Sequence, residues 1–139
     1  MFTDQITLRP RYGEVDRMGY VYHANFVVYC HQARTELMRR LGIEDRKLEE
    51  EKILLPVIEM QLTHKKPAYY DDLLTIVTTI TKLRETKLYF EFTIQNEQQE
   101  LVCAAKTTVA FVHAETRKPL RMPQLIKNAL SVHFKLFNP

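Results

Sequence analysis

The stretch GEVDRMGYVYHANFVVYCHQARTELMRRLG, residues 13–42, carries the most regular apolar pattern in the chain. Its apolar residues recur at steps of three and four positions, at Phe26, Cys30, Ala33, Leu37 and Leu41. This spacing predicts a helix over residues 25–41 with one apolar face, which needs another element to cover it. Gly42 and the two arginines in the last turn are typical of a helix C-terminus.

Two of the three glycines of the chain, Gly13 and Gly19, lie on either side of Asp16, just ahead of this helix. We expect them to shape a tight loop that presents the Asp16 carboxylate to the N-terminus of the helix. Backbone N–H groups at that terminus are unpaired and carry partial positive charge. A carboxylate beside them could act as a base or nucleophile next to a site that stabilises an oxyanion. The commoner role of such an aspartate, as an N-cap or turn residue, stays open as the alternative.

The rest of the chain predicts a sheet that covers this helix. After Pro56 the apolar period changes from 3.6 to 2, which is typical of strands. We expect strands at residues 2–12, 58–64, 73–83, 87–95 and 101–113, and further helices at 44–52 and 123–137. A run of strands after a helix indicates an α+β fold, with an antiparallel sheet of about five strands wrapped around one long helix. The uncovered face and edges of such a sheet lead us to expect self-association.

The bulk composition excludes several classes of protein. At 139 residues the chain fits one domain, residues 1–139, and no apolar run is long enough for a membrane span. The N-terminus carries charges where a signal peptide would be apolar, so we expect a cytoplasmic protein. Cys30 and Cys103 lie in apolar segments and are expected to be buried, unreactive thiols. A net charge of +3 does not indicate nucleic-acid binding, although it would suit a ligand that carries phosphates.

The residues from Asp16 to Ile43 resemble the hotdog-fold acyl-CoA thioesterases of the 4-hydroxybenzoyl-CoA thioesterase type. Within this family, the stretch resembles the subgroup that includes the Tol-Pal-associated acyl-CoA thioesterases. The matching positions are Glu14, Asp16, Gly19, Val21, Tyr22, His23, Ala24 and Asn25, followed by Ala33, Arg34, Thr35 and Glu36. Residues 65–74, KKPAYYDDLL, resemble the next strand-turn-strand block of the family. Val15, Tyr20 and Phe26 depart from the residues that are common in the family, which bears on acyl preference rather than on the fold.

The resemblance implies that the chain hydrolyses an acyl-CoA thioester to a free acid and CoA. It implies that Asp16 acts as nucleophile or as general base on water, that the backbone N–H of His23 stabilises the oxyanion, and that Gly19 shapes the loop. Tyr22 and Asn25 are candidate substrate contacts, with packing and helix-start roles as the alternative. The acyl group would lie in a tunnel between helix and sheet. The resemblance also implies a homo-oligomer, a dimer or a tetramer, that needs no metal or redox cofactor.

Five basic residues are candidates for binding the phosphates of CoA, because Arg and Lys pair with phosphate. They are Arg84, Lys87, Arg117, Lys118 and Arg121. Related enzymes bind the nucleotide at the protein surface, often across a subunit interface. The alternative, a solvated surface side chain, is open for each of the five. Acyl carrier protein, an acidic partner with a phosphopantetheine arm, is an alternative carrier of the thioester.

Other chemistries lack their motifs. Ser131 is the one serine, and no GxSxG, HExxH, CxxC, GxGxxG or P-loop motif occurs. Their absence argues against a serine hydrolase, a zinc site and a nucleotide-binding fold. Three alternatives stay open: a non-catalytic acyl-CoA-binding hotdog protein, a hotdog dehydratase and an RNA-binding protein. The intact Asp16 argues against the first, the lack of an identifiable catalytic His-Asp pair against the second, and the lack of a dense basic stripe against the third.

Overall fold

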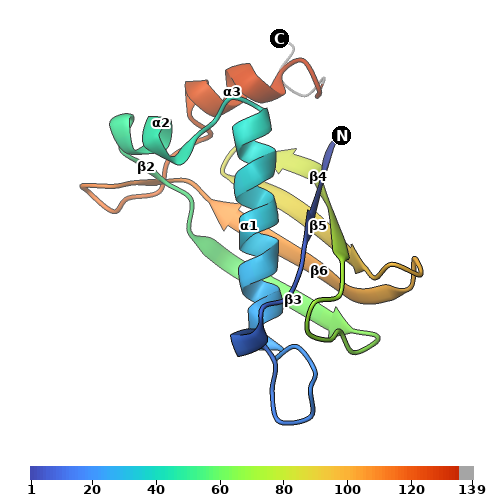
Figure 1. Ribbon diagram of the computed structural model, residues 1–139. Helices are drawn as coiled ribbons and strands as arrows, with labels where there is room; N and C mark the ends of the chain where they lie inside the picture. Colours follow the sequence, from blue (N-terminus) through green and yellow to red (C-terminus); the bar gives the residue numbers. More distant parts are fainter. Residues whose placement is uncertain (135–139) are drawn as a thin grey trace.

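The long helix α1, Ala24–Arg40, crosses one face of a five-stranded antiparallel sheet (Figure 1). The computed structural model describes residues 1–134 of the chain. The sheet has the order β1-β4-β5-β6-β3. Its strands are β1 Phe2–Leu8, β4 Leu74–Arg84, β5 Lys87–Gln95, β6 Leu101–Ala110 and β3 Val57–His64. This arrangement confirms the predicted α+β fold, in which a sheet wraps around one helix.

Shorter elements complete the chain around the two ends of α1. They are the 3-10 turn η1 Tyr12–Glu14, the helix α2 Asp45–Glu50, the strands β2 Ile53–Leu54 and β7 Val112–His113, and the helix α3 Gln124–Leu130. β2 and β7 pair with each other outside the main sheet. α3 lies near the C-terminal end of α1 (Figure 1). No helix in the described part of the chain has the length and apolar character that crossing a membrane requires.

Three predicted boundaries differ from the observed ones. The first strand ends at Leu8 rather than at residue 12, since Pro10 has no N–H to donate to the ladder. The strand expected over 101–113 is divided into β6 and β7, because the chain leaves the main sheet after Ala110 to pair with β2. The helix expected over 123–137 ends at Leu130, where the Ser131 hydroxyl donates to Asn128 O at 3.1 Å. Residues 135–137 of that prediction lie outside the described residues.

The core forms between the apolar face of α1 and the inner face of the sheet. Leu37 on α1 and Leu74, Phe90 and Ile94 on the strands are fully buried. Burying a side chain of this size contributes roughly 1.5–3 kcal/mol. This shared burial holds α1 at a fixed position on the sheet, so the position of its N-terminus is fixed too.

Both cysteines are free and buried in this core, as the sequence predicted. Burial raises the pKa of Cys30 to about 12 and the pKa of Cys103 to about 11. The two thiols therefore stay protonated at neutral pH and are poor nucleophiles.

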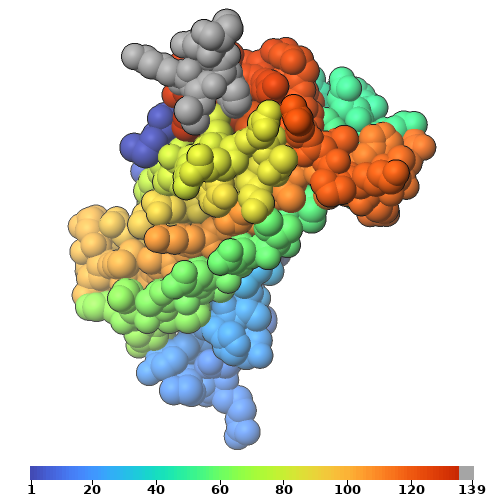
Figure 2. All heavy atoms as spheres, turned by 180° about the vertical axis from the view of Figure 1, so that it is seen from behind, coloured from blue at the N-terminus to red at the C-terminus, as the bar shows by residue number. Residues whose placement is uncertain are grey.

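The face of the sheet opposite α1 carries polar side chains, and no helix of the described residues covers its β3–β6 part (Figure 2). Glu91 and Lys106 stand opposite each other there on β5 and β6, with 3.7 Å between Oε1 and Nζ. At the sheet edge, β3 pairs with β6 alone among the strands within residues 1–134. The Val57 and Ile58 side chains on this edge are about half exposed. An open edge with exposed apolar side chains is a surface at which another strand can pair.

An ion pair connects the first strand to the C-terminal end of α1. The Asp4 carboxylate is buried on the helix side of β1, 2.7 Å from Arg40 Nε. The neighbouring Arg39 pairs instead with Glu36 on the exposed side of the helix. A buried carboxylate depends on its partner far more than an exposed one does, because water cannot replace that partner.

Replacing Arg40 with Met is expected to lower the free energy of unfolding by about 1–3 kcal/mol, because Asp4 then stays buried without this partner. The matched control Arg39→Met removes the same charge from an exposed pair and is expected to leave the unfolding midpoint unchanged. Urea unfolding followed by circular dichroism measures both variants. Equal losses in the two variants would contradict the role given to the Asp4–Arg40 pair.

Candidate active site

Asp16 closes the loop ahead of α1. Its backbone N–H donates to Tyr20 O at 2.7 Å, and its Oδ1 accepts from the N–H groups of Met18 and Tyr20 at 2.9 and 3.2 Å. The N–H of Gly19 donates to Asp16 O at 3.0 Å. Asp16 is therefore a turn residue, as the commoner alternative predicted. Its Oδ2 accepts no hydrogen bond from the described residues, so this oxygen is available to a substrate or a water molecule.

The two glycines that flank Asp16 differ in their backbone requirement. Gly19 has a φ of +83°, a conformation that residues with a Cβ rarely adopt. Gly13 lies in η1 and has no positive φ. A Cβ added at either position would meet no atom within 4 Å. The backbone conformation therefore favours glycine at position 19, whereas no such requirement exists at position 13.

The carboxylate of Glu14 holds the start of the Asp16 loop through three hydrogen bonds. It accepts hydrogen bonds from the N–H of Arg11 at 2.9 Å, from Arg11 Nε at 3.2 Å and from the Tyr29 hydroxyl at 2.7 Å. Burial by itself would raise the pKa of Glu14, but these hydrogen bonds and the Arg11 charge together lower it. Burial and the bond to Glu14 raise the pKa of Tyr29, which keeps its proton as the donor. The stabilisation by Glu14 is therefore present above its ordinary pKa and is lost as pH falls through its lowered pKa.

The loop is also tied to the first turn of α1. Glu14 O accepts the backbone N–H of Tyr22 and the side-chain Nδ2 of Asn25, both at 2.8 Å. The Asn25 amide thus holds the start of α1 against the loop, which supports the helix-start role of Asn25 over a substrate contact. Tyr22 is half exposed, and its ring centroid lies 4.5 Å from that of His23, so Tyr22 is accessible to a ligand.

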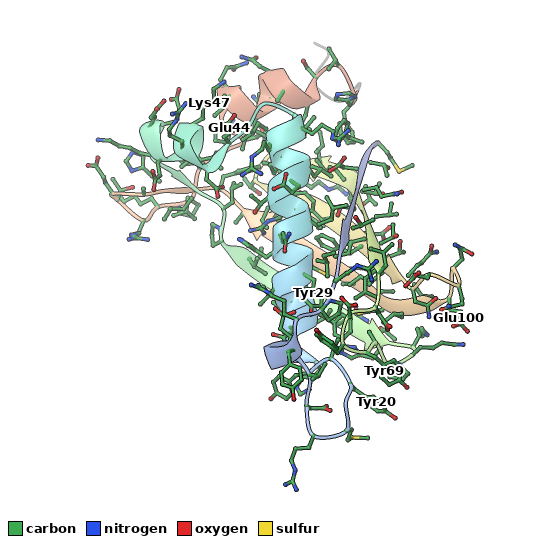
Figure 3. All side chains as sticks on the ribbon, viewed as in Figure 1. Tyr20, Tyr29, Glu44, Lys47, Tyr69 and Glu100 are labelled. Atoms are coloured by element: carbon green, nitrogen blue, oxygen red, sulfur yellow. The ribbon has the colours of Figure 1, made fainter. Side chains whose placement is uncertain are left out.

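A second loop, between β3 and β4, closes on the first one. The N–H of Val21 donates to Ala68 O at 2.7 Å. The rings of Tyr20 and Tyr69 meet edge to face with their centroids 5.5 Å apart (Figure 3). These contacts fix the segment around Ala68 beside the Asp16 loop.

A cavity of about 340 Å³ lies where the two loops meet the first turn of α1. Its lining comprises Asp16, Tyr20, Val21, His23 and Phe26, together with the segment 64–68. His23 has helical dihedral angles, φ −55° and ψ −33°, and its backbone N–H donates to no acceptor within the described residues. The structure thus brings a carboxylate and a residue with an unpaired helix-terminal N–H to one cavity, an arrangement that can stabilise an oxyanion next to a base.

Residues 64–68 are part of this cavity, although the sequence did not place them there. The His64 ring packs against Phe26 with 5.3 Å between ring centroids. The backbone N–H groups of Lys65 and Lys66 both donate to Val102 O, and the Lys66 side chain pairs with Glu100. The resemblance of KKPAYYDDLL to a family block was the one available signal, because local periodicity does not show which loops meet. Within residues 1–134, no group of three or more His, Cys, Asp and Glu side chains is arranged to hold a metal ion.

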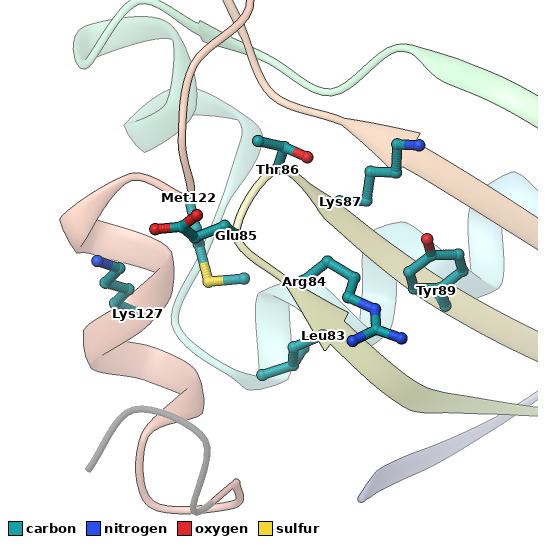
Figure 4. Close-up of a pocket in the computed structure, with 8 residues that line it drawn as sticks. All are labelled: Leu83, Arg84, Glu85, Thr86, Lys87, Tyr89, Met122 and Lys127. Atoms are coloured by element: carbon teal, nitrogen blue, oxygen red, sulfur yellow. The ribbon is translucent and has the colours of Figure 1, made fainter. Parts of the chain in front are cut away.

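The basic candidates lie at the other end of α1 from Asp16. Arg84 and Lys87 flank the β4–β5 turn and line a cavity of about 780 Å³ with Tyr89, Met122 and Lys127 (Figure 4). With 17 residues, α1 is about 25 Å long. A single chain therefore does not bring Arg84 and Lys87 to the Asp16 cavity.

The other three basic candidates differ in their surroundings. Arg121 lies 3.4 Å from the Glu85 carboxylate, so part of its charge is already compensated. Arg117 and Lys118 lie in the turn after β7, where the N–H of Arg117 donates to His113 O. Arg84 and Lys87 differ from these three in lining the 780 Å³ cavity.

Comparison with known proteins identifies the family. The sequence profile of the thioesterase-like superfamily matches residues 10–130. The chain belongs to the thioesterase-like superfamily. Both the hotdog family and the enzyme class predicted from the sequence, a thioester hydrolase, are thereby confirmed.

The relatives of this thioesterase cover most of its length. It is 31% identical over 121 residues to the putative acyl-CoA thioesterase YneP of Bacillus subtilis strain 168, covering 87% of this chain and 88% of that protein. It is 34% identical over 119 residues to the acyl-CoA thioester hydrolase YbgC of Escherichia coli O6:H1, covering 86% and 89%. The crystal structure of DHNA-CoA thioesterase from Staphylococcus aureus superposes with a TM-score of 0.90 at 25% identity, covering 98% and 91%.

Replacing Gly19 with Ala is expected to cost about 1–2 kcal/mol of stability, because the positive φ becomes strained, and to lower thioesterase activity as the Asp16 loop shifts. Gly13→Ala is the matched control, since both sites have open space and only Gly19 has a positive φ. Thermal unfolding and thiol release are measured for both. A Gly13→Ala variant as unstable as Gly19→Ala would show that the backbone conformation is not the cause.

Proposed function

We propose that the protein hydrolyses acyl-CoA thioesters to a free acid and CoA at the Asp16 cavity. The observation that supports this proposal is that Asp16 and His23, whose N–H is unpaired among the described residues, line one cavity by the start of α1. The names of two curated relatives, acyl-CoA thioesterase and acyl-CoA thioester hydrolase, support CoA over acyl carrier protein as the carrier. The acyl carrier protein ester remains the alternative substrate.

In the general-base route, Asp16 takes a proton from a water molecule as the water oxygen attacks the thioester carbonyl. The resulting oxyanion accepts a hydrogen bond from the His23 N–H and lies in the positive field of the α1 N-terminus. One such donor contributes about 3–4 kcal/mol to lowering the barrier. Collapse of the tetrahedral intermediate breaks the C–S bond, and the CoA thiolate leaves and takes up a proton.

In the nucleophilic route, a carboxylate oxygen of Asp16 attacks the carbonyl and forms a mixed anhydride as the CoA thiolate leaves. Water then hydrolyses the anhydride and regenerates the carboxylate. Both routes use the same oxyanion donor, so the proposed roles of Asp16 and His23 do not depend on the choice between them. Gly19 shapes the loop in both routes, and Tyr22 is positioned to contact the bound ester.

The proposed assembly is a homo-oligomer, a dimer or a tetramer, built on the open edge of β3. Val57 begins β3 at the same end of the sheet as Lys87, because Val57 pairs with Val109 and Lys87 pairs with the next residue, Ala110. His64 ends β3 at the Asp16 cavity. Antiparallel pairing of two β3 edges would therefore bring the Lys87 end of one subunit toward the Asp16 cavity of the other. The basic residues at that end would then bind the CoA phosphates across the interface.

Asp16→Asn is expected to lower kcat for acyl-CoA hydrolysis by at least about 100-fold, because the amide keeps the shape of the turn but is neither a base nor a nucleophile. Asp71→Asn is the matched control, since it removes the same charge from the β3–β4 loop at a positive φ that Asn tolerates. Thiol release is measured with acetyl, medium-chain, long-chain and aromatic acyl-CoAs. Full turnover by a folded Asp16→Asn variant would remove Asp16 from the reaction, and binding without thiol release by the wild type would favour a non-catalytic binding protein.

Subunit complementation tests the shared site. Asp16→Asn and the double variant Arg84→Met/Lys87→Met are each expected to be weak at low substrate concentration, the second through a raised KM. Refolding the two variants together should restore about a quarter of wild-type activity, because half of the dimers are then mixed and each has one intact site. The same variants refolded separately and then combined without exchange are the control. Failure of the mixed dimers to regain activity would place the basic residues and Asp16 in independent sites.

A further inference from the structure

A second, smaller cavity of about 50 Å³ lies between α1 and β3, separate from the Asp16 cavity. Its apolar lining comprises Val27, Cys30, Val57, Met60 and Phe92. Three polar side chains also line it: His31 and Arg34 from α1 and Thr107 from β6. The proposed hydrolysis does not use this polar cluster, although two of its members are buried.

Arg34 is a buried cation that makes no direct ion pair, although the charge of the Asp45 carboxylate acts on it from a longer distance. Its side chain belongs to a residue only 9% exposed, and its Nη2 lies 3.1 Å from His31 Nδ1. Among residues 1–134, no carboxylate lies within ion-pair distance of this guanidinium. A buried charge is unfavourable unless a counter-charge or hydrogen bonds compensate it. The guanidinium therefore leaves most of its N–H donors available to an anion.

His31 and Thr107 add two donors to the same cavity. Burial and the Arg34 charge lower the pKa of His31, so its neutral imidazole accepts from Arg34 at Nδ1 and carries its proton on Nε2. The Thr107 hydroxyl is buried and has no hydrogen-bond partner in the described part of the chain. A buried hydroxyl without a partner is rare and calls for a ligand or a water.

The small cavity follows the Asp16 cavity along the same two elements. Phe26 and His64 line the Asp16 cavity, while Cys30 and Met60, four residues farther along α1 and four residues earlier on β3, line the small one. Arg34 follows His23 by eleven positions, which is about 16 Å along the helix axis. Helical side chains lean toward the helix N-terminus, so the guanidinium reaches back toward the Asp16 end. The two cavities share no lining residue, so an acyl group that starts at Asp16 and runs between these two elements would pass Phe26 before it ends at Arg34.

We propose that Arg34, His31 and Thr107 form a subsite for a carboxylate at the far end of the acyl group, so that the enzyme prefers ω-carboxyacyl-CoA thioesters. This inference rests on the proposed function, because it assigns the acyl class of the same reaction. A carboxylate is acceptor-only and binds a guanidinium with two parallel hydrogen bonds. It would compensate the charge of Arg34 and also accept from Thr107. A methyl-terminated chain would leave all these donors unpaired, which disfavours its binding.

The test compares ω-carboxyacyl-CoAs with unsubstituted acyl-CoAs of equal chain length. For the wild type, kcat/KM is expected to be about 10- to 100-fold higher with the carboxylate at the best length. Arg34→Met should abolish this preference while leaving hydrolysis of unsubstituted acyl-CoAs intact. Thr107→Val should reduce the preference severalfold. The matched control is Arg39→Met, which removes an arginine from the exposed side of the same helix and should keep the preference.

Three outcomes would overturn the subsite. The first is a wild type that shows no preference, and the second is an Arg34→Met variant that loses both activities equally. The third is dissociation of the oligomer by Arg34→Met in sedimentation, which would indicate that Arg34 pairs with a carboxylate of a second subunit. Removal of a buried charge that makes no direct ion pair should not lower stability, so thermal unfolding of Arg34→Met distinguishes a lost subsite from a misfolded chain.

Binding separates failure of the subsite from failure of the proposed function. Non-hydrolysable thioether analogues of CoA, ending in a carboxylate or in a methyl group, are compared by calorimetry. Tighter binding of the carboxylate analogue to the wild type and not to Arg34→Met supports the subsite even if no thioester is hydrolysed. Equal binding of the two analogues contradicts the subsite even if acyl-CoAs are hydrolysed.

Discussion

The burial of one face of α1 in the curved sheet is the constraint on which the rest of the structure depends. Leu37 and the strand residues Phe90 and Ile94 lose nearly all contact with water when they pack together. Because this packing fixes both the position and the rotation of the helix, it also fixes where the unpaired N–H groups of the first turn lie. The Asp16 loop then needs only short-range bonds, to Gly19, Tyr20 and the first turn, to keep its carboxylate at that terminus.

Polar contacts order the Asp16 end of the molecule. Glu14 joins η1, the loop and the start of α1 through its side chain and its carbonyl oxygen. A single carboxylate thus orders the segment without taking part in the proposed chemistry, while Asp16 is both a turn residue and the candidate base. One oxygen of Asp16 holds the turn, and the other accepts no hydrogen bond from the described residues. This division explains how one aspartate can have both of the roles that the sequence left as alternatives.

Periodicity and resemblance together predicted the elements and the fold, since helix and strand patterns are local properties of the sequence. The Asp16 loop was predictable for the same reason, because its motif is contiguous. Two features depended on long-range contacts and a third on backbone dihedral angles, and none of the three could be read from the pattern. His64 reaches the Asp16 cavity only because the β3–β4 loop closes on the first loop. Arg34 matches the family motif in the sequence, but its burial without a direct ion pair follows from the packing of α1 on the sheet. Gly13 and Gly19 are equivalent in the sequence pattern, but only Gly19 has a positive φ.

Strand β3 pairs with β6 on one side and has an open edge on the other, among the described residues. Residues of β3 also line both cavities. Whatever occupies the groove contacts the strand through which two subunits would join. In the proposed assembly, a ligand that binds the joined subunits better than the separate ones would favour association, and thermodynamic reciprocity requires association to favour the ligand by the same factor. An acyl group that orders β3 would tighten the assembly, and dilution that separates the subunits would weaken substrate binding in equal measure.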